Sequence, residues 1–239
     1  MQIGVAGEPC VLRAAGTLWL PQHKTLVVSD LHLEKGSAYA AKGQLLPPYD
    51  TRETLDRLLA EVAETQPRTL ILLGDSLHDM GAISRIPMAE REAVIELAQQ
   101  LDLVWISGNH DPDGGAAFGG RSTDEIQLGH LTLRHEPQAG LQAGEVAGHL
   151  HPCARVTGPA GAIRRRCFLS DGQRLILPAF GAYTGGLNAL DSAYDGLFTG
   201  KTCAYLLGNK ITPVATHRLA PDGRQAVTSR ARSAAPSGR

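Results

Sequence analysis

Short apolar runs recur through the first half of the chain. Leu26 to Ser29, Leu70 to Leu73 and Leu103 to Ile106 are rich in leucine and β-branched residues and are bounded by polar residues or glycine. Runs of this length and composition are typical of buried strands, because a strand that is covered on both faces does not alternate with polar residues. The pattern therefore predicts three buried strands.

Helical patterns separate these runs. After the first run, Asp50 followed by Glu53 predicts a capping box at the start of a helix. The apolar positions that follow recur at helical spacing and are Leu55, Leu58, Leu59 and Val62. Pro67 ends that element, and Pro87 opens a second helical segment. The apolar face of that second segment consists of Val94, Leu97 and Ala98. The first half of the chain is therefore predicted to be β-α-β-α-β.

After Gly119 the pattern changes to short apolar runs that are separated by turn residues. The predicted strands are Ile126 to Leu128, Leu131 to Arg134, Val146 to Leu150, Ala162 to Leu169, Leu175 to Leu177 and Cys203 to Leu207. A β-α-β half followed by a mostly β half packs best as two sheets that face each other. We therefore expect an α/β fold, a β-sandwich of two mixed sheets flanked by helices.

The length of 239 residues favours one large domain over two small ones. We expect this domain to span residues 1–219. From 220 to 239 the sequence is small, polar and dotted with arginine, which predicts a disordered tail.

Composition narrows the classes of protein that fit. A formal net charge of −1 excludes a protein that holds nucleic acid by bulk charge alone. The four cysteines lack C-x-x-C spacing and are expected to be reduced thiols. The N-terminus has no basic segment followed by an apolar run, and no stretch is long enough to span a bilayer. These features predict a cytoplasmic protein with no membrane partner. They do not determine the oligomeric state, and a homo-oligomer is one of the alternatives.

Polar side chains follow each of the three predicted strands of the first half. They are Asp30 and His32 after the first strand, Asp75 after the second, and Asn109, His110 and Asp111 after the third. The carboxyl ends of strands in open α/β sheets meet at one edge, where such folds place their sites. Strands of the second half lead to His135, His149 and His151. In an extended chain the D-x-H and H-x-H steps would each direct two side chains to the same side.

Carboxylate, amide and imidazole ligands without thiolates suit Mn²⁺, Fe or Zn²⁺. Two such ions, about 4 Å apart and bridged by Asp75, would hold the attacking and leaving oxygens of a phosphoryl displacement. Metal-bound water would supply the nucleophile, so the chemistry needs no serine or cysteine nucleophile. We expect His110 to protonate the leaving oxygen and Asp111 to hold the tautomer of His110. The sequence thus predicts a two-metal phosphoesterase site.

Taken in order from Asp30 to His151, the series D-x-H, G-D, G-N-H-D, H and G-H-x-H resembles the calcineurin-like metallophosphoesterase superfamily. The resemblance implies a β-sandwich flanked by helices. It also implies two sets of metal ligands, which are Asp30, His32, Asp75 and His151 for one ion and Asp75, Asn109, His135 and His149 for the other. His110 would be the catalytic histidine that binds no metal.

Longer stretches resemble the bacterial ligase-associated DNA damage response endonucleases. They are SDLHLEKG at 29–36, LPPYDT at 46–51, PAFG at 178–181 and TGG at 184–186. This resemblance implies Mn²⁺-dependent cleavage of DNA phosphodiester bonds, with single-stranded DNA as the substrate. It also implies a role in DNA repair alongside a DNA ligase, a helicase and an exonuclease.

One departure from the broad superfamily pattern is His78, which stands where many members carry a second aspartate. It argues against phosphomonoesterase chemistry on protein substrates. His78 is a candidate for contact with the substrate phosphate or leaving group, and a purely structural role is the alternative. Lys35, directly after the first ligand loop, is a candidate for contact with the DNA backbone. The consecutive residues Arg164, Arg165 and Arg166 are interpreted as part of a solvated hairpin, since alternate members of a strand point opposite ways and only some of them can face one ligand. A phosphate grip for a polynucleotide is the alternative.

Two other functions remain open at this stage. One is a phosphodiesterase or phosphatase for nucleotides or other small phosphoesters, which would use the same centre. The other is a non-catalytic, metal-stabilised scaffold in a repair complex. His110 and Asp111 argue against the scaffold, because a purely structural metal site has no need of them.

Overall fold

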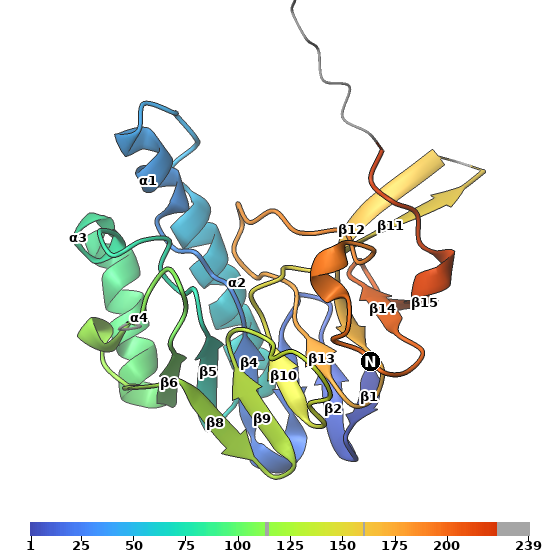
Figure 1. Cartoon of the computed structure of the whole chain (residues 1–239). Coiled ribbons are helices and arrows are strands. Elements are labelled where there is room, and N and C mark those ends of the chain that lie inside the picture. The colour runs from blue at the N-terminus through green and yellow to red at the C-terminus, as the bar shows by residue number, and fades with distance from the viewer. Residues whose placement is uncertain (113–114, 160, 224–239) are drawn as a thin grey trace, which may run out of the picture.

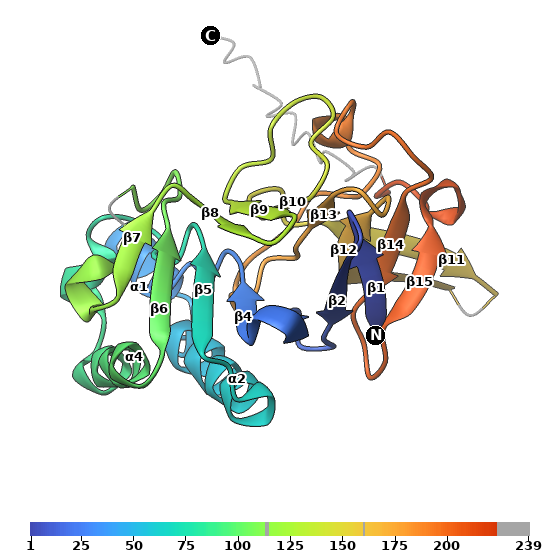
Figure 2. The same cartoon turned by 90° about the horizontal axis from the view of Figure 1, so that it is seen from below.

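The computed structural model describes residues 1–112, 115–159 and 161–223, and it consists of two β-sheets with helices on the outer face of the first (Figures 1 and 2). The first sheet has seven strands, which lie side by side in chain order. They are β1 (Gln2–Val5), β2 (Glu8–Leu12), β3 (Leu18–Leu20), β4 (Thr25–Val28), β5 (Thr69–Leu73), β6 (Asp102–Ile106) and β7 (Arg121–Thr123). Neighbours from β1 to β4 are antiparallel, and those from β4 to β7 are parallel.

The second sheet has eight strands, seven of them in the order β15-β14-β12-β13-β10-β9-β8, and β11 pairs with β12. Their bounds are β8 (Glu125–Leu128), β9 (Leu131–Arg134), β10 (Glu145–Ala147), β11 (Cys153–Gly158), β12 (Gly161–Ser170), β13 (Leu175–Ile176), β14 (Cys203–Leu206) and β15 (Thr212–Ala215). The pairs β9-β10 and β10-β13 are parallel and the others are antiparallel. Both sheets are therefore mixed, as the sequence predicts.

The helices of the described residues are short except for two. They are α1 (Lys35–Ala41), α2 (Asp50–Thr65), α3 (Ala82–Arg85) and α4 (Met88–Gln100). Short 3-10 helices lie at Pro21–His23, Ala116–Phe118, Ser192–Tyr194 and Thr216–Arg218. Figure 2 shows α2 and α4 on the side of β5 and β6 that faces away from the second sheet. Among the described residues, no helix has both the length and the apolarity needed to cross a membrane.

Strands β4, β5 and β6 are buried on both faces, which explains why their sequences do not alternate. Val27 and Ile71 pack into a core between the two sheets, together with Phe168 of the second sheet. Leu26 and Leu70 point the other way and pack against the apolar face of the helices. The parallel strands are therefore fixed in register from both sides, and their carboxyl ends are presented at one edge of the sandwich.

The predicted capping box at Asp50 is wrong. The residue at the N-cap of α2 is Tyr49, and no side chain caps that end of the helix. Asp50 instead accepts a hydrogen bond from the backbone N–H of Gly36, with a distance of 2.9 Å from Gly36 N to Asp50 Oδ2. A tertiary contact has taken the side chain that the local pattern assigned to the helix itself.

The first residues of the predicted tail contact the folded part of the chain. The Ala220 N–H donates to the carbonyl oxygen of Arg155 at 2.8 Å. The carboxylate of Asp222 pairs with Arg164, with 3.1 Å between Nε and Oδ1. Residues 224–239 lie outside the described residues.

Candidate metal centre

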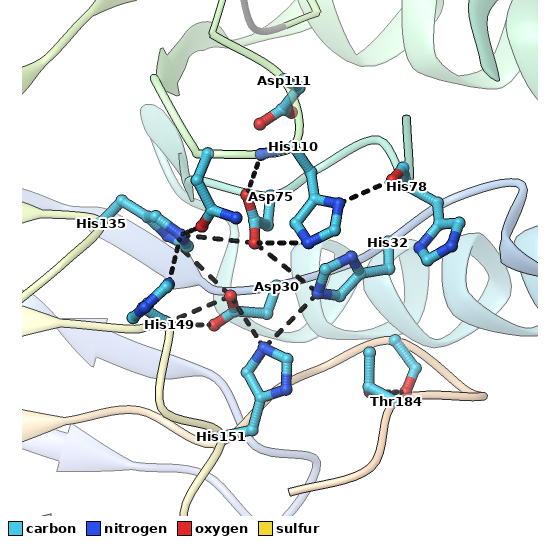
Figure 3. Close-up of polar contacts among 12 residues, drawn as sticks. Asp30, His32, Asp75, His78, His110, Asp111, His135, His149, His151 and Thr184 are labelled. Carbon is cyan, nitrogen blue, oxygen red and sulfur yellow. Dashed lines mark hydrogen bonds and ion pairs between the residues drawn. The ribbon is translucent and has the colours of Figure 1, made fainter. Parts of the chain in front are cut away.

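The predicted ligands come from five loops that meet at the carboxyl edge of the first sheet (Figure 3). The loop after β4 carries Asp30 and His32, and the loop after β5 carries Asp75. The loop after β6 carries Asn109 and His110. From the second sheet, His135 follows β9, and the loop after β10 carries His149 and His151. Both sheets therefore contribute to one cluster.

Backbone hydrogen bonds hold these loops together. The His32 N–H donates to the carbonyl oxygen of Asp75 at 2.9 Å, and the Gly148 N–H donates to that of His135 at 2.9 Å. The backbone N–H of His149 donates to Asp30 Oδ2 at 3.0 Å, which joins the two sheets at the site. The loops position one another and leave the imidazole rings free to converge.

The backbone around the cluster adopts an uncommon conformation. The residues with positive φ include Asp30 (55°), His32 (45°), Asp75 (46°), His149 (66°) and His151 (46°). Each such non-glycine residue costs about 1–3 kcal/mol and persists only where surrounding contacts fix it, as at functional sites. The prediction that an extended chain directs each pair to one side is therefore wrong. Left-handed turns, and not strand alternation, direct these side chains.

Glycines let the loops approach one another closely. A Cβ on Gly108 would lie 2.2 Å from the backbone nitrogen of Asp75. Gly74 has a φ of +75°, and a Cβ there would lie 2.2 Å from His135 Nδ1. Any side chain at these two positions would push Asp75 or His135 out of the cluster.

Among the described residues, three sets of metal-ligand side chains bring their ligand atoms within 4.8 Å of one another. The sets are Asp30, His32 and His151; Asp75, His135 and His149; and His32, His78 and His110. The first two each contain a carboxylate, Asp30 in the first and Asp75 in the second. The third has three imidazoles and no carboxylate, and its His110 side chain is 41% exposed.

The first set is compact and buried. His151 Nε2 lies 3.0 Å from Asp30 Oδ1 and 3.4 Å from His32 Nε2. Burial lowers the pKa of His32 to about 3, so its ring is neutral and offers a lone pair. Burial by itself would raise the pKa of Asp30, but the hydrogen bond and charge of His151 lower it. The ligand atoms of one carboxylate and two imidazoles thus converge in a space that a cation fits.

The second set has the same character. His135 Nε2 lies 3.4 Å from Asp75 Oδ2, 3.2 Å from His149 Nδ1 and 3.1 Å from Asn109 Oδ1. Its other ring nitrogen, Nδ1, is 3.1 Å from the carbonyl oxygen of Leu73 and donates to it. Such a bond is the usual second contact of a metal-binding imidazole, because it aims the other nitrogen at the ion.

Asp75 belongs to the second set and also faces the first. Its Oδ2 is 3.8 Å from His32 Nε2 and 3.4 Å from His135 Nε2, so one oxygen faces both. Its Oδ1 accepts the backbone N–H of His110 at 2.9 Å. Burial opposes ionisation, but the hydrogen bond and charge of His135 lower the pKa of Asp75 to about 2. Burial likewise opposes protonation of His135, yet Asp75 and Asp30 raise its pKa to about 9. A cation held by Asp75 and His135 would take the place of the His135 proton.

Comparisons with known proteins agree with this geometry. The family model of the calcineurin-like phosphoesterases matches residues 23–177, which include every residue of the cluster. The chain belongs to the calcineurin-like phosphoesterase family. It is therefore a metal-dependent phosphoesterase, and the predicted fold and enzyme class are confirmed.

Two solved structures illustrate the likeness. The structure of Pseudomonas putida nuclease MPE is 31% identical, with 90% of this chain and 99% of that chain covered and a TM-score of 0.71. The structure of Yfce, a phosphoesterase from E. coli, is 16% identical, with 80% of this chain and 98% of that chain covered and a TM-score of 0.41. A search of curated proteins found no match.

In this phosphoesterase, Asp111 does not contact the imidazole of His110 as predicted. Its Oδ2 accepts the backbone N–H groups of Ser76 and Leu77, at 2.8 and 3.0 Å. Asp111 is 1% exposed, and burial raises the pKa of its carboxyl to about 6. The side chain therefore holds the loop after β5 in place. The reason is the path of the loop after β6, which directs the His110 ring toward the cluster and the Asp111 carboxylate away from it (Figure 3).

The carbonyl oxygen of His78 orients the imidazole of His110, a role that the sequence analysis assigned to Asp111. It lies 2.9 Å from His110 Nδ1. The His78 ring stacks on the His110 ring, with 5.6 Å between centroids and 19° between planes. Lys35 begins α1 and is half-buried, so it stands beside the site and not among the ligands. Sequence reasoning singled out both residues but could not foresee a role for a main-chain oxygen.

Proposed function

We propose that this phosphoesterase is a Mn²⁺-dependent endonuclease that hydrolyses single-stranded DNA. The observation that supports this most is the likeness to Pseudomonas putida nuclease MPE, which extends over 90% of the chain. A likeness of that extent includes the ligand loops and the segments that surround them. The proposal therefore assigns a phosphodiester of a polynucleotide to the site.

We assign the ligands in two sets that share Asp75. The first consists of Asp30, His32, Asp75 and His151, and the second of Asp75, Asn109, His135 and His149. Mn²⁺ is the proposed ion, and Fe and Zn²⁺ suit the same donors. When bound, two such ions supply an ionised water as nucleophile and neutralise charge on the phosphate.

His110 is the proposed general acid. Its Nδ1 faces the carbonyl oxygen of His78, which only accepts, so Nδ1 carries a hydrogen. Nε2 lies 4.0 Å from Asp75 Oδ2 and is directed at the metal centre. A doubly protonated ring therefore donates from Nε2 to the leaving oxygen and stays oriented by Nδ1 afterwards. Asp111 then acts indirectly, because it holds the loop after β5, which carries the carbonyl oxygen of His78.

His78 is proposed to contact the leaving group or the phosphate. Its ring lies on the side of His110 that faces α1, outside both carboxylate-containing sets. Lys35 is proposed to contact the DNA backbone on the same side. Loss of either residue is expected to weaken substrate binding more than metal binding.

The proposed setting is DNA repair in the cytoplasm, alongside a DNA ligase, a helicase and an exonuclease. Affinity purification of the chain from its own cells, with and without DNA damage, tests this association. Recovery of those enzymes supports it, and their absence under both conditions contradicts it.

The defining experiment uses the purified chain with Mn²⁺ on circular single-stranded DNA and on a panel of mononucleotides. An endonuclease converts the circle to linear and then shorter strands and leaves the mononucleotides intact. A chelator in place of Mn²⁺ serves as the control and should stop cleavage. Phosphate release from mononucleotides with an intact circle would replace this proposal by a phosphatase for small phosphoesters.

A further inference from the structure

The stretches 29–36 and 46–51 meet in the structure at the start of α1. The Thr51 hydroxyl donates to Glu34 Oε1 and accepts the Glu34 backbone N–H, both at 2.8 Å. Asp50 Oδ2 accepts the Gly36 N–H, and a Cβ on Gly36 would lie 2.6 Å from Asp50 Oδ1. Glu34 and Asp50 are each 5% exposed, so these bonds are buried and strong. They fix where α1 begins.

A second contact holds α1 against the segment that carries His78. Arg85 of α3 donates from Nε to Ser37 Oγ at 2.9 Å, and its other arm pairs with Asp79 at 2.8 Å. Figure 1 shows α1 and α3 next to each other above the carboxyl edge of the first sheet. The helix is therefore held in place on the side of the site where His78 lies.

One face of α1 is turned toward His78. Lys35 and Tyr39 belong to α1 and Lys42 is the C-cap residue that follows it, and their spacing of i, i+4 and i+7 places them on one side of the helix. The ring centroids of Tyr39 and His78 are 6.1 Å apart. Lys35, which is half-buried, and Lys42, which is exposed, flank Tyr39 on this face, so two ammonium groups accompany the ring. A continuous row of side chains thus runs from Asp75 through His110 and His78 to α1.

The opposite side of the metal centre is negatively charged. The hollow next to Asn109 and His135 is also lined by Asp124, Glu125 and Glu136. Its one arginine, Arg134, is paired with Glu125 at 2.7 Å. A polyanion that leaves the metal centre is therefore repelled on that side and attracted on the side of α1.

Two ammonium groups beside one aromatic ring form the pattern that binds single-stranded nucleic acid, with charge for phosphates and a ring for a base. We propose that the α1 face formed by Lys35, Tyr39 and Lys42 is the subsite for the nucleotide next to the scissile bond, on the leaving-group side. Lys35 and Lys42 contact its phosphates, and Tyr39 stacks on its base. This inference rests on the proposed function and adds Tyr39 and Lys42 to the substrate contacts.

The test compares two single-stranded substrates of equal length and charge, oligothymidylate and an abasic deoxyribose-phosphate oligomer, with Mn²⁺ present. Tyr39→Ala should raise KM for oligothymidylate about 5- to 150-fold, the range for loss of one stacked base, and leave KM for the abasic oligomer unchanged. Tyr39→Phe keeps the ring and should restore the wild-type KM. Lys42→Ala should raise KM for both substrates and reduce the slope of log KM against log salt by about 0.7.

Lys201→Ala, an exposed lysine outside the site, is the matched control and should change none of these values. Manganese content per chain verifies that each variant retains its metal centre. If the wild-type chain cleaves DNA, but Tyr39→Ala affects both substrates equally or neither, the subsite is wrong and the proposed function stands. A wild-type chain that cleaves neither substrate would overturn both.

Discussion

Potential metal ligands gather at the carboxyl edge of β4, β5 and β6, and cationic side chains gather in the run Arg164, Arg165 and Arg166 on β12. In the first region, ligand atoms of several residues converge, as with His151 Nε2, which lies 3.4 Å from His32 Nε2 and 3.0 Å from Asp30 Oδ1. In the second, Arg164 pairs with Asp222 and donates to the carbonyl oxygen of Gly186. The first region combines carboxylates and imidazoles with no ammonium or guanidinium group among them, so it suits a cation from outside the chain, whereas Arg164 already has its partners within the chain.

Arg166 shows how the second region supports the first. It is half-buried and donates to the carbonyl oxygens of Ala179 and Phe180, at 2.7 and 3.2 Å. The Phe180 N–H in turn donates to the carbonyl oxygen of Ser29, next to Asp30. The predicted solvated hairpin is therefore correct for the exposed Arg165 but wrong for Arg166. Successive residues of a strand point to opposite sides, so Arg165 faces solvent while Arg166 reaches the carbonyl oxygens of Ala179 and Phe180.

The largest effect is expected from Asp75→Ala. Its Oδ2 faces both sets of ligands, so its loss should remove the shared ligand of both ions. Turnover should fall by at least about 10³-fold, since bound metal supplies several kcal/mol of transition-state stabilisation. Elemental analysis and hydrolysis rates measure the two effects. Two metals per chain with wild-type turnover would contradict the shared-ligand assignment.

The next effect separates proton donation from metal binding at adjacent residues. His110→Ala should keep both ions and slow hydrolysis by about 10²- to 10⁴-fold on a deoxyribose leaving group. The loss should be small on p-nitrophenolate, which leaves without a proton. Asn109→Ala, the comparison variant, should instead lower metal occupancy and affect both substrates. Equal losses on the two leaving groups would remove the acid role of His110.

A smaller effect is expected within the arginine run. Arg166→Ala should lower the free energy of unfolding by about 1.5–3 kcal/mol, the range for hydrogen bonds from a charged group. Arg165→Ala, its exposed neighbour, should change it by less than about 0.5 kcal/mol. Urea denaturation of both variants measures the difference. Equal effects would show that Arg166 has no special partners.

The smallest effect is expected from the cysteines. Burial and, to a smaller extent, the charge of Glu8 raise the pKa of the Cys10 thiol to about 12, so the thiolate that binds metal is disfavoured. Replacement of Cys10, Cys153, Cys167 and Cys203 by alanine or serine should leave metal content and turnover per folded chain near wild type. Metal loss from a folded variant would make a thiol part of the centre.

The sequence predicted the parts of the molecule that local pattern determines. Strands β4, β5 and β6 were recognised because burial on both faces makes them continuously apolar. Strands β1, β2 and β3 lack this signal, since buried residues alternate with half-buried ones in β2 and β3 and only Val5 is buried in β1. Helix α1 was missed because buried tertiary bonds from Asp50 and Thr51 fix its start.

The same limit applies to the site. Residue type and position after strands were enough to collect Asp30, Asp75 and His151 into one cluster. Their directions were not predictable, because left-handed backbone at these residues depends on hydrogen bonds between loops that are distant in sequence. The role of the His78 carbonyl oxygen was hidden for a related reason, since every residue carries a carbonyl and only the fold selects one.

The central claim is a pair of metal ions that share Asp75, and crystals grown with Mn²⁺ test it most directly. Anomalous diffraction should show two manganese peaks per chain, about 4 Å apart, with Asp75 bound to both. One peak should contact Asp30, His32 and His151, and the other Asn109, His135 and His149. A single peak, or a manganese ion held by His78 and His110 in place of the carboxylates, would contradict the account.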